Sequence, residues 1–568
     1  EAAWPGAHTS TNHLAETASS PTDAASQAEP LAVGGALRLA RPEALPIRTH
    51  FDADPLRALF GAPISLEPGE RAVVQLLANT FMVRRSTEPD GGSVAAVAAK
   101  SIAVLPLANE SGDKDEQYFS DGLSEDLITA LSQFAGLKVI SRNSSFQFRN
   151  SADDSRTIGD KLGVAHLLEG SVRHAGDMVR ISAQLVNAAD GSTSWSQRYD
   201  RPYKDLFALQ DDITGAVATA LRTKLLESNG AVVQSDRPPN GNLDAWNAYS
   251  RGRFHGALID PADARSAIGF YEQAVAFDPR YARAYAGLSL AWTVLGGTFL
   301  SGDEQRQAYV SARAAADRAL QLDADVATAH DARGLLLQWA DLDWTGAEAE
   351  YRRAAELAPA DGLSKFNLGR LFATLGQPQQ AIPMIRQAIA IDPRNSAAHY
   401  WLAWNLAATG RLQEAEEAAR KAIELMPGKP FLPAGLAIIQ IQRGEIAAAL
   451  DSAQQEPPGA WRDIALAIAL QVGSDRAAAD AALKDLIARS ADGAAYQIAE
   501  AYGLRKDPDS MFTWLDRAWD IRDSGISRLL TDPFILPYAD DPRFAAFCRK
   551  VGLPAPGPAA PTGSAGAS

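Results

Sequence analysis

Three residue types recur in this chain at the same interval of 34 positions. The recurring residues are Gly376, Gly410 and Gly444; Pro359, Pro393 and Pro427; and Ala381, Ala415 and Ala449. A period of this length is typical of helical hairpins, which cannot bury their apolar faces alone and therefore stack on one another. Small alanines let helices approach, glycine closes the turn within a hairpin, and proline ends the second helix. From about residue 243 the sequence predicts an all-α superhelix of such hairpins.

The hairpins resemble the tetratricopeptide repeat, whose pattern is Trp-x2-Leu-Gly-x2-Tyr, then Ala-x3-Phe, then proline. Residues 362–395 match it at Leu368, Gly369, Phe372, Ala381, Ile385, Ala388 and Pro393. The resemblance implies tetratricopeptide repeats over 243–463, followed by decayed helical repeats and a C-terminal cap over 464–553. It also implies that the chain binds a protein or peptide partner.

Five residues on the first helices of successive repeats are the candidate partner-binding residues. By analogy with the family, the concave face of the superhelix should carry Trp339, Phe366, Arg370, Tyr400 and Trp404. Aromatic side chains and arginine are enriched among residues that dominate protein–protein affinity. The alternative is that these aromatic rings pack between adjacent helices or against the preceding domain.

Residues 101–226 show a different pattern, which predicts a compact α/β domain. Short apolar runs at 101–107 and 137–141 are typical of buried strands. Residues 164–174 and 178–188 flank a Gly-Asp pair that is typical of a hairpin turn. A helix with one buried face is predicted by the four-residue spacing of Leu209, Ile213, Val217, Leu221 and Leu225.

An acidic stretch, "YFSDGLSEDLITAL" (118–131), raises the question of an active or metal site. Its apolar residues repeat at helical spacing, whereas Asp121, Glu125 and Asp126 fall off that face. A metal would require ligands that converge from elsewhere in the chain, and the sequence identifies none. We therefore expect these three carboxylates to form a solvated helix face.

The segments 101–148, 158–201 and 205–221, in this order, are similar to the TolB amino-terminal-like domain of bacteria. In that family the domain precedes tetratricopeptide repeats and often follows a membrane anchor. A winged-helix DNA-binding domain, a class III nucleotide cyclase or a Ser/Thr kinase lies upstream of the anchor. The resemblance implies a sensory or scaffolding region at the periplasmic face of the inner membrane, with an anchor upstream of Glu1; a cytoplasmic location is the alternative.

The remaining features argue against catalysis and against nucleic-acid binding. The chain has a formal net charge of −15, whereas phosphate contacts need a basic face. It contains neither His-Glu-x-x-His nor Gly-x-Ser-x-Gly, and its histidines are scattered. We expect no enzyme activity, no cofactor and no metal site.

Three further segments complete the predicted organisation. Residues 1–45 are predicted to be a disordered linker and residues 554–568 a disordered tail. Residues 46–100 are predicted to hold short elements: a helix in "FDADPLRALFG" and one or two strands in "RAVVQLLANTFMVRRS".

Three functional hypotheses follow from the sequence. The first is a non-catalytic interaction region of a bacterial signalling protein. The second is a free-standing periplasmic scaffold. The third is the regulatory portion of a nucleotide cyclase or of a membrane-anchored transcriptional regulator whose effector domain lies outside this chain.

Overall fold

The computed structural model of this chain comprises two units, residues 1–96 and 97–568. The structure describes residues 36–38, 48–51, 71–77, 80–86, 100–113, 116–132, 134–221, 224–225, 236–257, 260–300 and 302–555. The predicted linker and tail lie outside the described residues, apart from 36–38 and 554–555. The helix expected at 51–61 lies outside them as well, apart from Phe51.

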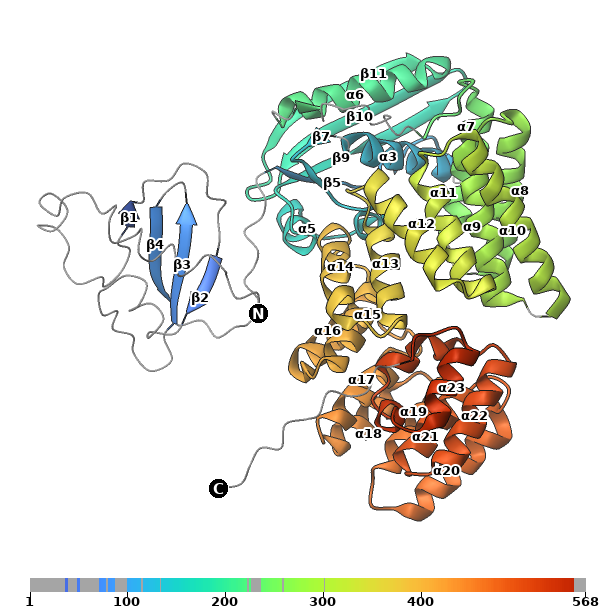
Figure 1. The fold of residues 1–568 in the computed structure, drawn as a ribbon. Coiled ribbons are helices and arrows are strands. Elements are labelled where there is room, and N and C mark those ends of the chain that lie inside the picture. The colour runs from blue at the N-terminus through green and yellow to red at the C-terminus, as the bar shows by residue number, and fades with distance from the viewer. Residues whose placement is uncertain are drawn as a thin grey trace, which may run out of the picture. The chain divides into compact units, whose positions relative to one another are not determined.

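The first unit contains a four-stranded antiparallel sheet (Figure 1). Its strands are β1 (Ala36–Arg38), β2 (Arg48–Phe51), β3 (Arg71–Leu77) and β4 (Thr80–Ser86), in the order β1-β4-β3-β2. β3 and β4 pair along their whole length, with Val74 opposite Val83. Both lie in the stretch for which one or two strands are predicted.

The second unit begins with a mixed sheet in the order β11-β10-β9-β5-β8, with β6 also paired to β9. The strands are β5 (Ser101–Val104), β6 (Ala108–Asn109), β8 (Lys138–Val139), β9 (His166–Ala175), β10 (Met178–Asn187) and β11 (Thr193–Pro202). β9, β10 and β11 are antiparallel, whereas β5 is parallel to β8 and β9. β9 and β10 are joined at Gly176, whose φ of +57° suits the predicted hairpin turn. A separate pair is formed by β7 (Phe134–Ala135) and β12 (Lys224–Leu225).

Helices cover both faces of this sheet, as predicted for an α/β domain. α3 (Gln117–Leu131) and α6 (Leu206–Ala220) pack on one face, and α5 (Ser155–Leu162) packs on the other. Because side chains alternate along a strand, Ile102 belongs to the first core and Ala103 to the second. The expected helix is shorter than predicted, since α6 ends at Ala220 and Leu225 lies in β12. The short helices α4 (Arg142–Ser145) and η2 (Phe146–Phe148) follow β8.

From α7 onward the chain forms helical hairpins in which each helix packs on the next (Figure 1). The helices are α7 (Leu243–Gly256), α8 (Pro261–Phe277), α9 (Ala282–Phe299), α10 (Gly302–Leu322), α11 (Ala327–Leu336) with η4 (Leu337–Asp341), α12 (Trp344–Leu357), α13 (Gly362–Thr374), α14 (Pro378–Ile391), α15 (Ser396–Ala408), α16 (Leu412–Leu425), α17 (Leu432–Gln442), α18 (Ile446–Gln455), α19 (Ala460–Gln471), α20 (Arg476–Ser490), α21 (Ala495–Leu504) and α22 (Pro508–Asp520).

The periodic residues have the predicted roles in these hairpins. Ala381 and Ala415 are fully buried where paired helices meet. Gly410 has a φ of +77°, as the turn between α15 and α16 requires, and Gly376 and Gly444 are likewise left-handed. α14 ends two residues before Pro393, and the same spacing separates α12 and α16 from their prolines.

After α22 the chain returns to hairpins that precede it by many residues. This C-terminal segment, residues 524–553, contains the 3-10 helices η5 (Ser524–Thr531) and η6 (Leu536–Tyr538) and helix α23 (Pro542–Lys550). η5 packs against the first helices α13, α15 and α21. Gly552, just after α23, lies beside the indole of Trp344. The segment therefore covers part of the surface formed by the first helices of the hairpins, which we call the inner face.

Candidate functional site

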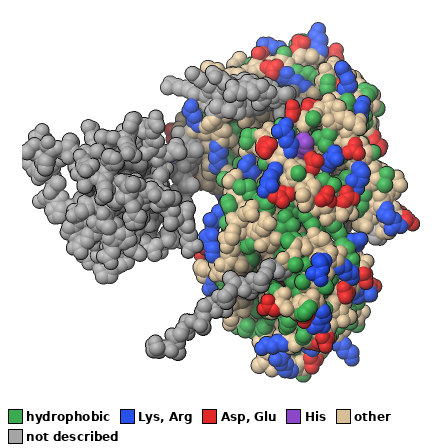
Figure 2. Space-filling model, in the orientation of Figure 1, with side chains coloured by type: hydrophobic (Ala, Val, Ile, Leu, Met, Phe, Trp, Pro, Cys, Tyr) green, Lys and Arg blue, Asp and Glu red, His purple; other side chains and the backbone are tan. Residues whose placement is uncertain are grey.

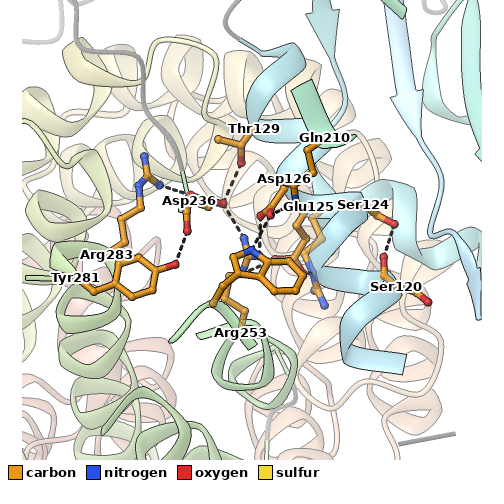
Figure 3. Close-up of polar contacts among 12 residues, drawn as sticks. Ser120, Ser124, Glu125, Asp126, Thr129, Gln210, Asp236, Arg253, Tyr281 and Arg283 are labelled. Atoms are coloured by element: carbon orange, nitrogen blue, oxygen red, sulfur yellow. Dashed lines mark hydrogen bonds and ion pairs between the residues drawn. The ribbon is translucent and has the colours of Figure 1, made fainter. Parts of the chain in front are cut away.

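A network of buried charges joins the α/β domain to the first repeat helix (Figure 3). Arg253 on α7 lies 3.0 Å from Asp126 and 3.1 Å from Glu125, which are both on α3. The same guanidinium lies 2.7 Å from Asp236, in the connection that precedes α7. Asp236 also pairs with Arg283 at 2.6 Å. This ionic junction therefore ties three separate parts of the chain together.

The prediction that Asp121, Glu125 and Asp126 form a solvated face is wrong. Their exposed fractions are 2%, 7% and 8%. α3 packs its apolar side on the sheet, but its opposite side lies against α7, so neither side faces water. Asp121 pairs with Arg149 at 2.6 Å, and Glu125 pairs with Arg142.

The pKa values of the two central carboxylates of the junction, Asp126 and Asp236, are shifted in opposite directions. Burial raises the pKa of Asp126 to about 6, although Arg253 opposes the shift. Burial would also raise the pKa of Asp236, but the guanidinium groups of Arg283 and Arg253 hold it below its usual value. Trp246 Nε1 donates to Asp126 at 2.8 Å. Each carboxylate thus has a hydrogen-bonded partner, which is typical of a structural junction.

The α/β domain contacts the repeats at a second place, the connection between α14 and α15. The backbone N–H of Ser141 donates to the carbonyl of Ile391 at 3.1 Å. Ser144 Oγ donates to Asp392 and accepts a 2.9 Å hydrogen bond from the N–H of Arg394. The hydroxyl-rich stretch 141–148 therefore docks the domain onto the repeats.

On the inner face, aromatic side chains from three consecutive hairpins form a row. Tyr400 on α15 meets Phe431, just before α17, with ring centroids 5.4 Å apart. Phe431 meets Trp461 on α19 at 5.9 Å, and Tyr400 meets Trp404 at 6.1 Å. Together with Glu500 and Arg528, this aromatic row lines a small pocket. Tyr400, Phe431 and Trp461 are half-buried, so part of each residue remains accessible to solvent.

The position of Phe431 in the row depends on an unusual backbone conformation. Its φ is +70°, which costs a residue other than glycine about 1–2 kcal/mol. Glu456, itself fully buried, accepts hydrogen bonds from the N–H groups of Phe431 at 2.6 Å and Ala434 at 3.0 Å. Backbone strain that the surroundings enforce is frequent at binding sites.

A cation from the C-terminal segment reaches the aromatic row. The guanidinium of Arg528 lies 4.5 Å from the ring centroid of Trp404 and 5.4 Å from that of Tyr496. It pairs with Glu500 on α21 at 3.2 Å. Burial raises the pKa of the Glu500 carboxyl well above its usual range, against the opposing effect of Arg528.

The structure divides the five candidate residues of the inner face into two clusters. Tyr400 and Trp404 lie in the aromatic row. The guanidinium of Arg370 lies 5.8 Å from the rings of both Trp339 and Phe366. Within the described residues, Nε and Nη2 of Arg370 are buried without a hydrogen-bond acceptor.

Two of the five candidate residues are buried by packing between helices. Trp404 is 2% exposed and Phe366 is 8% exposed, so both contribute to the cores between helices. Phe431, Trp461, Glu500 and Arg528 are not among the residues predicted from the sequence. Aromatic residues near the repeat interval could have indicated Phe431 and Trp461, since they follow Tyr400 on successive hairpins.

Two features of the described part of the chain bear on other kinds of site. No group of three His, Cys, Asp or Glu side chains there is arranged to hold a metal ion. None of the described helices combines the length and apolar character needed to cross a bilayer.

Two parts of the chain match known protein families, one in the hairpins and one in the α/β domain. Residues 366–430 match the tetratricopeptide repeat. The hairpins within this range therefore match the tetratricopeptide repeat that the sequence predicts there. Residues 98–215 match the second domain of HilA/YgeH-like transcriptional regulators.

Two named proteins share part of this sequence. The chain is 40% identical over 195 residues to "Putative adenylate cyclase 3" of Rhizobium meliloti (strain 1021), covering 34% of this chain and 32% of that protein. It is 37% identical over 95 residues to "Small glutamine-rich tetratricopeptide repeat-containing protein 2" of Mycosarcoma maydis, covering 17% and 27%. The chain thus spans about a third or less of the length of these relatives.

Solved structures show distant likeness to the repeats. YrrB, described as a TPR protein with an unusual peptide-binding site, is 20% identical, with 38% of this chain and 97% of YrrB covered and a TM-score of 0.27. Yeast Tom70 is 15% identical, with 57% and 70% covered and a TM-score of 0.35. At these values neither structure bears on the function of this chain.

Proposed function

We propose that this chain is a non-catalytic interaction region of a bacterial signalling protein, and that its repeats bind a protein or peptide through the inner face. The observation that carries the proposal is the row of half-buried rings, Tyr400, Phe431 and Trp461, on three consecutive hairpins. Aromatic rings give large contact areas at low entropic cost and dominate many interfaces. The strained backbone of Phe431 supports a role for the row beyond packing.

Other features argue against nucleic-acid binding and against catalysis by this chain. On the face shown in Figure 2, basic and acidic side chains are intermixed rather than gathered into a basic patch. A basic patch is what phosphate binding requires. The acidic residues that most resembled an active site are paired with arginines: Asp121 with Arg149, and Glu125 and Asp126 with Arg253 of the ionic junction.

The signalling context rests on the relatives. A match to the second domain of transcriptional regulators and 40% identity to a cyclase-named protein both favour a regulatory portion attached to an effector. The resemblance of residues 101–221 to the TolB amino-terminal-like domain favours the periplasmic face of the inner membrane. The coding sequence that precedes Glu1 discriminates between a winged helix with an anchor, a cyclase domain and a signal peptide alone.

Selection of random peptides displayed on phage, with the full chain as bait, tests the binding role. Binders should lose about thirtyfold in affinity, near 2 kcal/mol, when Trp461→Ala removes a ring of the row. Trp519→Ala is the matched control, because Trp519 is also half-buried but lies on α22, the second helix of its hairpin. Failure to enrich any peptide, or equal affinity for both variants, would contradict the proposal.

A further inference from the structure

Part of the inner face is occupied by a segment of the chain itself, the 3-10 helix η5. η5 is a 3-10 helix of 8 residues. Runs of 3-10 helix beyond three or four residues are uncommon, because their hydrogen-bond geometry is poor. η5 is therefore held in place mainly by the helices that it contacts, which are α22, directly before it, and the first helices α13, α15 and α21.

Besides Ile526 and Leu529, which are buried in a core that includes residues of α21, two side chains of η5 contact the inner face. Arg528 stacks on Trp404 and pairs with Glu500. Leu530 lies against Gly376, where an added Cβ would stand 2.9 Å from the Cβ of Leu530. The absence of a side chain at Gly376 therefore allows the leucine to approach the turn after α13.

The groups that contact Arg528, Glu500 and Trp404, restrict which side chain could replace it. If Arg528 left, Glu500 would lose its cation and Trp404 its cation–π contact, both in a buried environment. Breaking such a pair is strongly unfavourable, whereas exchanging one guanidinium for another conserves every contact. Arginine suits the site better than lysine, because its planar group stacks on a ring while it pairs with a carboxylate.

The aromatic row gives an incoming segment a place to bind beside Arg528. Tyr400, Phe431 and Trp461 are half-buried and line the same pocket as Glu500 and Arg528. A partner can therefore contact the rings before the arginine is exchanged.

From these contacts we propose that the C-terminal segment is an internal competitor for the inner face. The partner displaces η5 with a segment of its own that carries an arginine followed by leucine side chains. This inference rests on the proposed function and adds to it the chemical class of the partner and its competition with residues 524–532.

The test uses a fluorescein-labelled peptide with the sequence of residues 524–537, SGISRLLTDPFILP, titrated into the full chain by fluorescence anisotropy. The Arg528→Ala chain, whose own segment is loosened, should bind it at least about tenfold more tightly than the unmodified chain. A peptide with alanine in place of its arginine should bind that variant at least about tenfold more weakly. Arg543→Ala is the control: Arg543 on α23 pairs with Asp541 and with Asp509 of α22, its side chain is 44% exposed, and its loss should leave affinity unchanged.

A folded Arg528→Ala chain that binds the peptide no better than the unmodified chain overturns the proposal. If that variant does not fold, hydrogen exchange of the unmodified chain decides. Saturating peptide should increase exchange at residues 524–536, and unchanged exchange overturns the proposal. Phage-selected peptides that need Trp461 but leave this exchange unchanged would overturn the competition while the proposed binding function stands.

Discussion

The guanidinium of Arg253 lies 3.0 Å from the carboxylate of Asp126, although 127 positions separate the two residues in the chain. The same guanidinium also contacts Glu125 and Asp236. One side chain thus contacts three carboxylates where the α/β domain meets the repeats. The attachment of the two parts therefore depends on this arginine more than on any surface ion pair.

Arg253→Ala should lower the free energy of unfolding by about 3–5 kcal/mol, because it leaves the buried carboxylate of Asp126 without a cation, whereas Asp236 keeps Arg283 and Glu125 keeps Arg142. Urea denaturation of the full chain measures the change. Arg180→Ala is the matched control: Arg180 pairs with Asp200 at 2.6 Å, but both side chains are over 40% exposed. That variant should lose less than about 1 kcal/mol. Equal losses would mean that the junction is not buried in solution.

Gly410→Ala and Gly269→Ala should shift stability in opposite directions. Gly410 has a φ of +77° with open space around its Cα, so alanine there suffers only backbone strain of about 1 kcal/mol or more. Gly269 lies in α8, also with open space, and alanine there should stabilise the helix by up to about 1 kcal/mol. Thermal melting of both variants checks the signs. A melting temperature of Gly410→Ala equal to or above that of the unmodified chain would contradict the left-handed conformation of Gly410.

Glu456→Ala should destabilise the chain and weaken peptide binding at the aromatic row. It removes the acceptor for two N–H groups, those of Phe431 and Ala434, and an unpaired buried donor costs about 1–3 kcal/mol. Glu456→Gln keeps one side-chain oxygen as acceptor and should lose less. Anisotropy with a phage-selected peptide and urea denaturation follow the two effects. Unchanged binding in a folded Glu456→Ala chain would show that the conformation of Phe431 does not matter to the row.

His330 should make stability fall as the pH rises. Burial alone would lower its pKa, but the hydrogen bond with Glu350 at 2.6 Å raises it above 6.5, against the repulsion of Arg353. A histidine whose folded pKa is raised contributes stability that is fully present below its unfolded pKa and is lost as the pH rises through the folded value. The advantage of the unmodified chain over His330→Gln should therefore shrink between about pH 6 and about pH 8. A difference that stays constant over this range would contradict the ion pair.

Periodicity was sufficient to predict the parts of the fold in which neighbours in space are neighbours in sequence. The 34-residue step places small residues where paired helices touch, and Ala381 and Ala415 occupy those positions, while Gly410 occupies the turn between two helices. Alternation along 178–187 likewise predicts β10, whose Val179 and Ile181 face the core. In both cases the pattern reports directly on which side is buried.

The parts that the sequence could not predict depend on contacts between distant positions. The spacing of apolar residues identifies one buried face of α3, but a second face buried by charged residues leaves no such pattern. Asp126 is buried because Arg253 and Trp246 lie against it. Arg528 lies in a segment without repeats, so no period connects it with Trp404 or Glu500.

The return of η5 to α13 has an evolutionary consequence. Arrays of helical hairpins commonly gain or lose whole units, since each unit touches only its neighbours. Here η5 contacts both α13 and α21. The number of hairpins between these two helices is therefore fixed by the distance that η5 spans. Deleting or duplicating one of them would move Leu530 away from Gly376 and Arg528 away from Trp404. Homologues that keep this contact should therefore vary in length before α13 or within connections, and not by whole hairpins between α13 and α22.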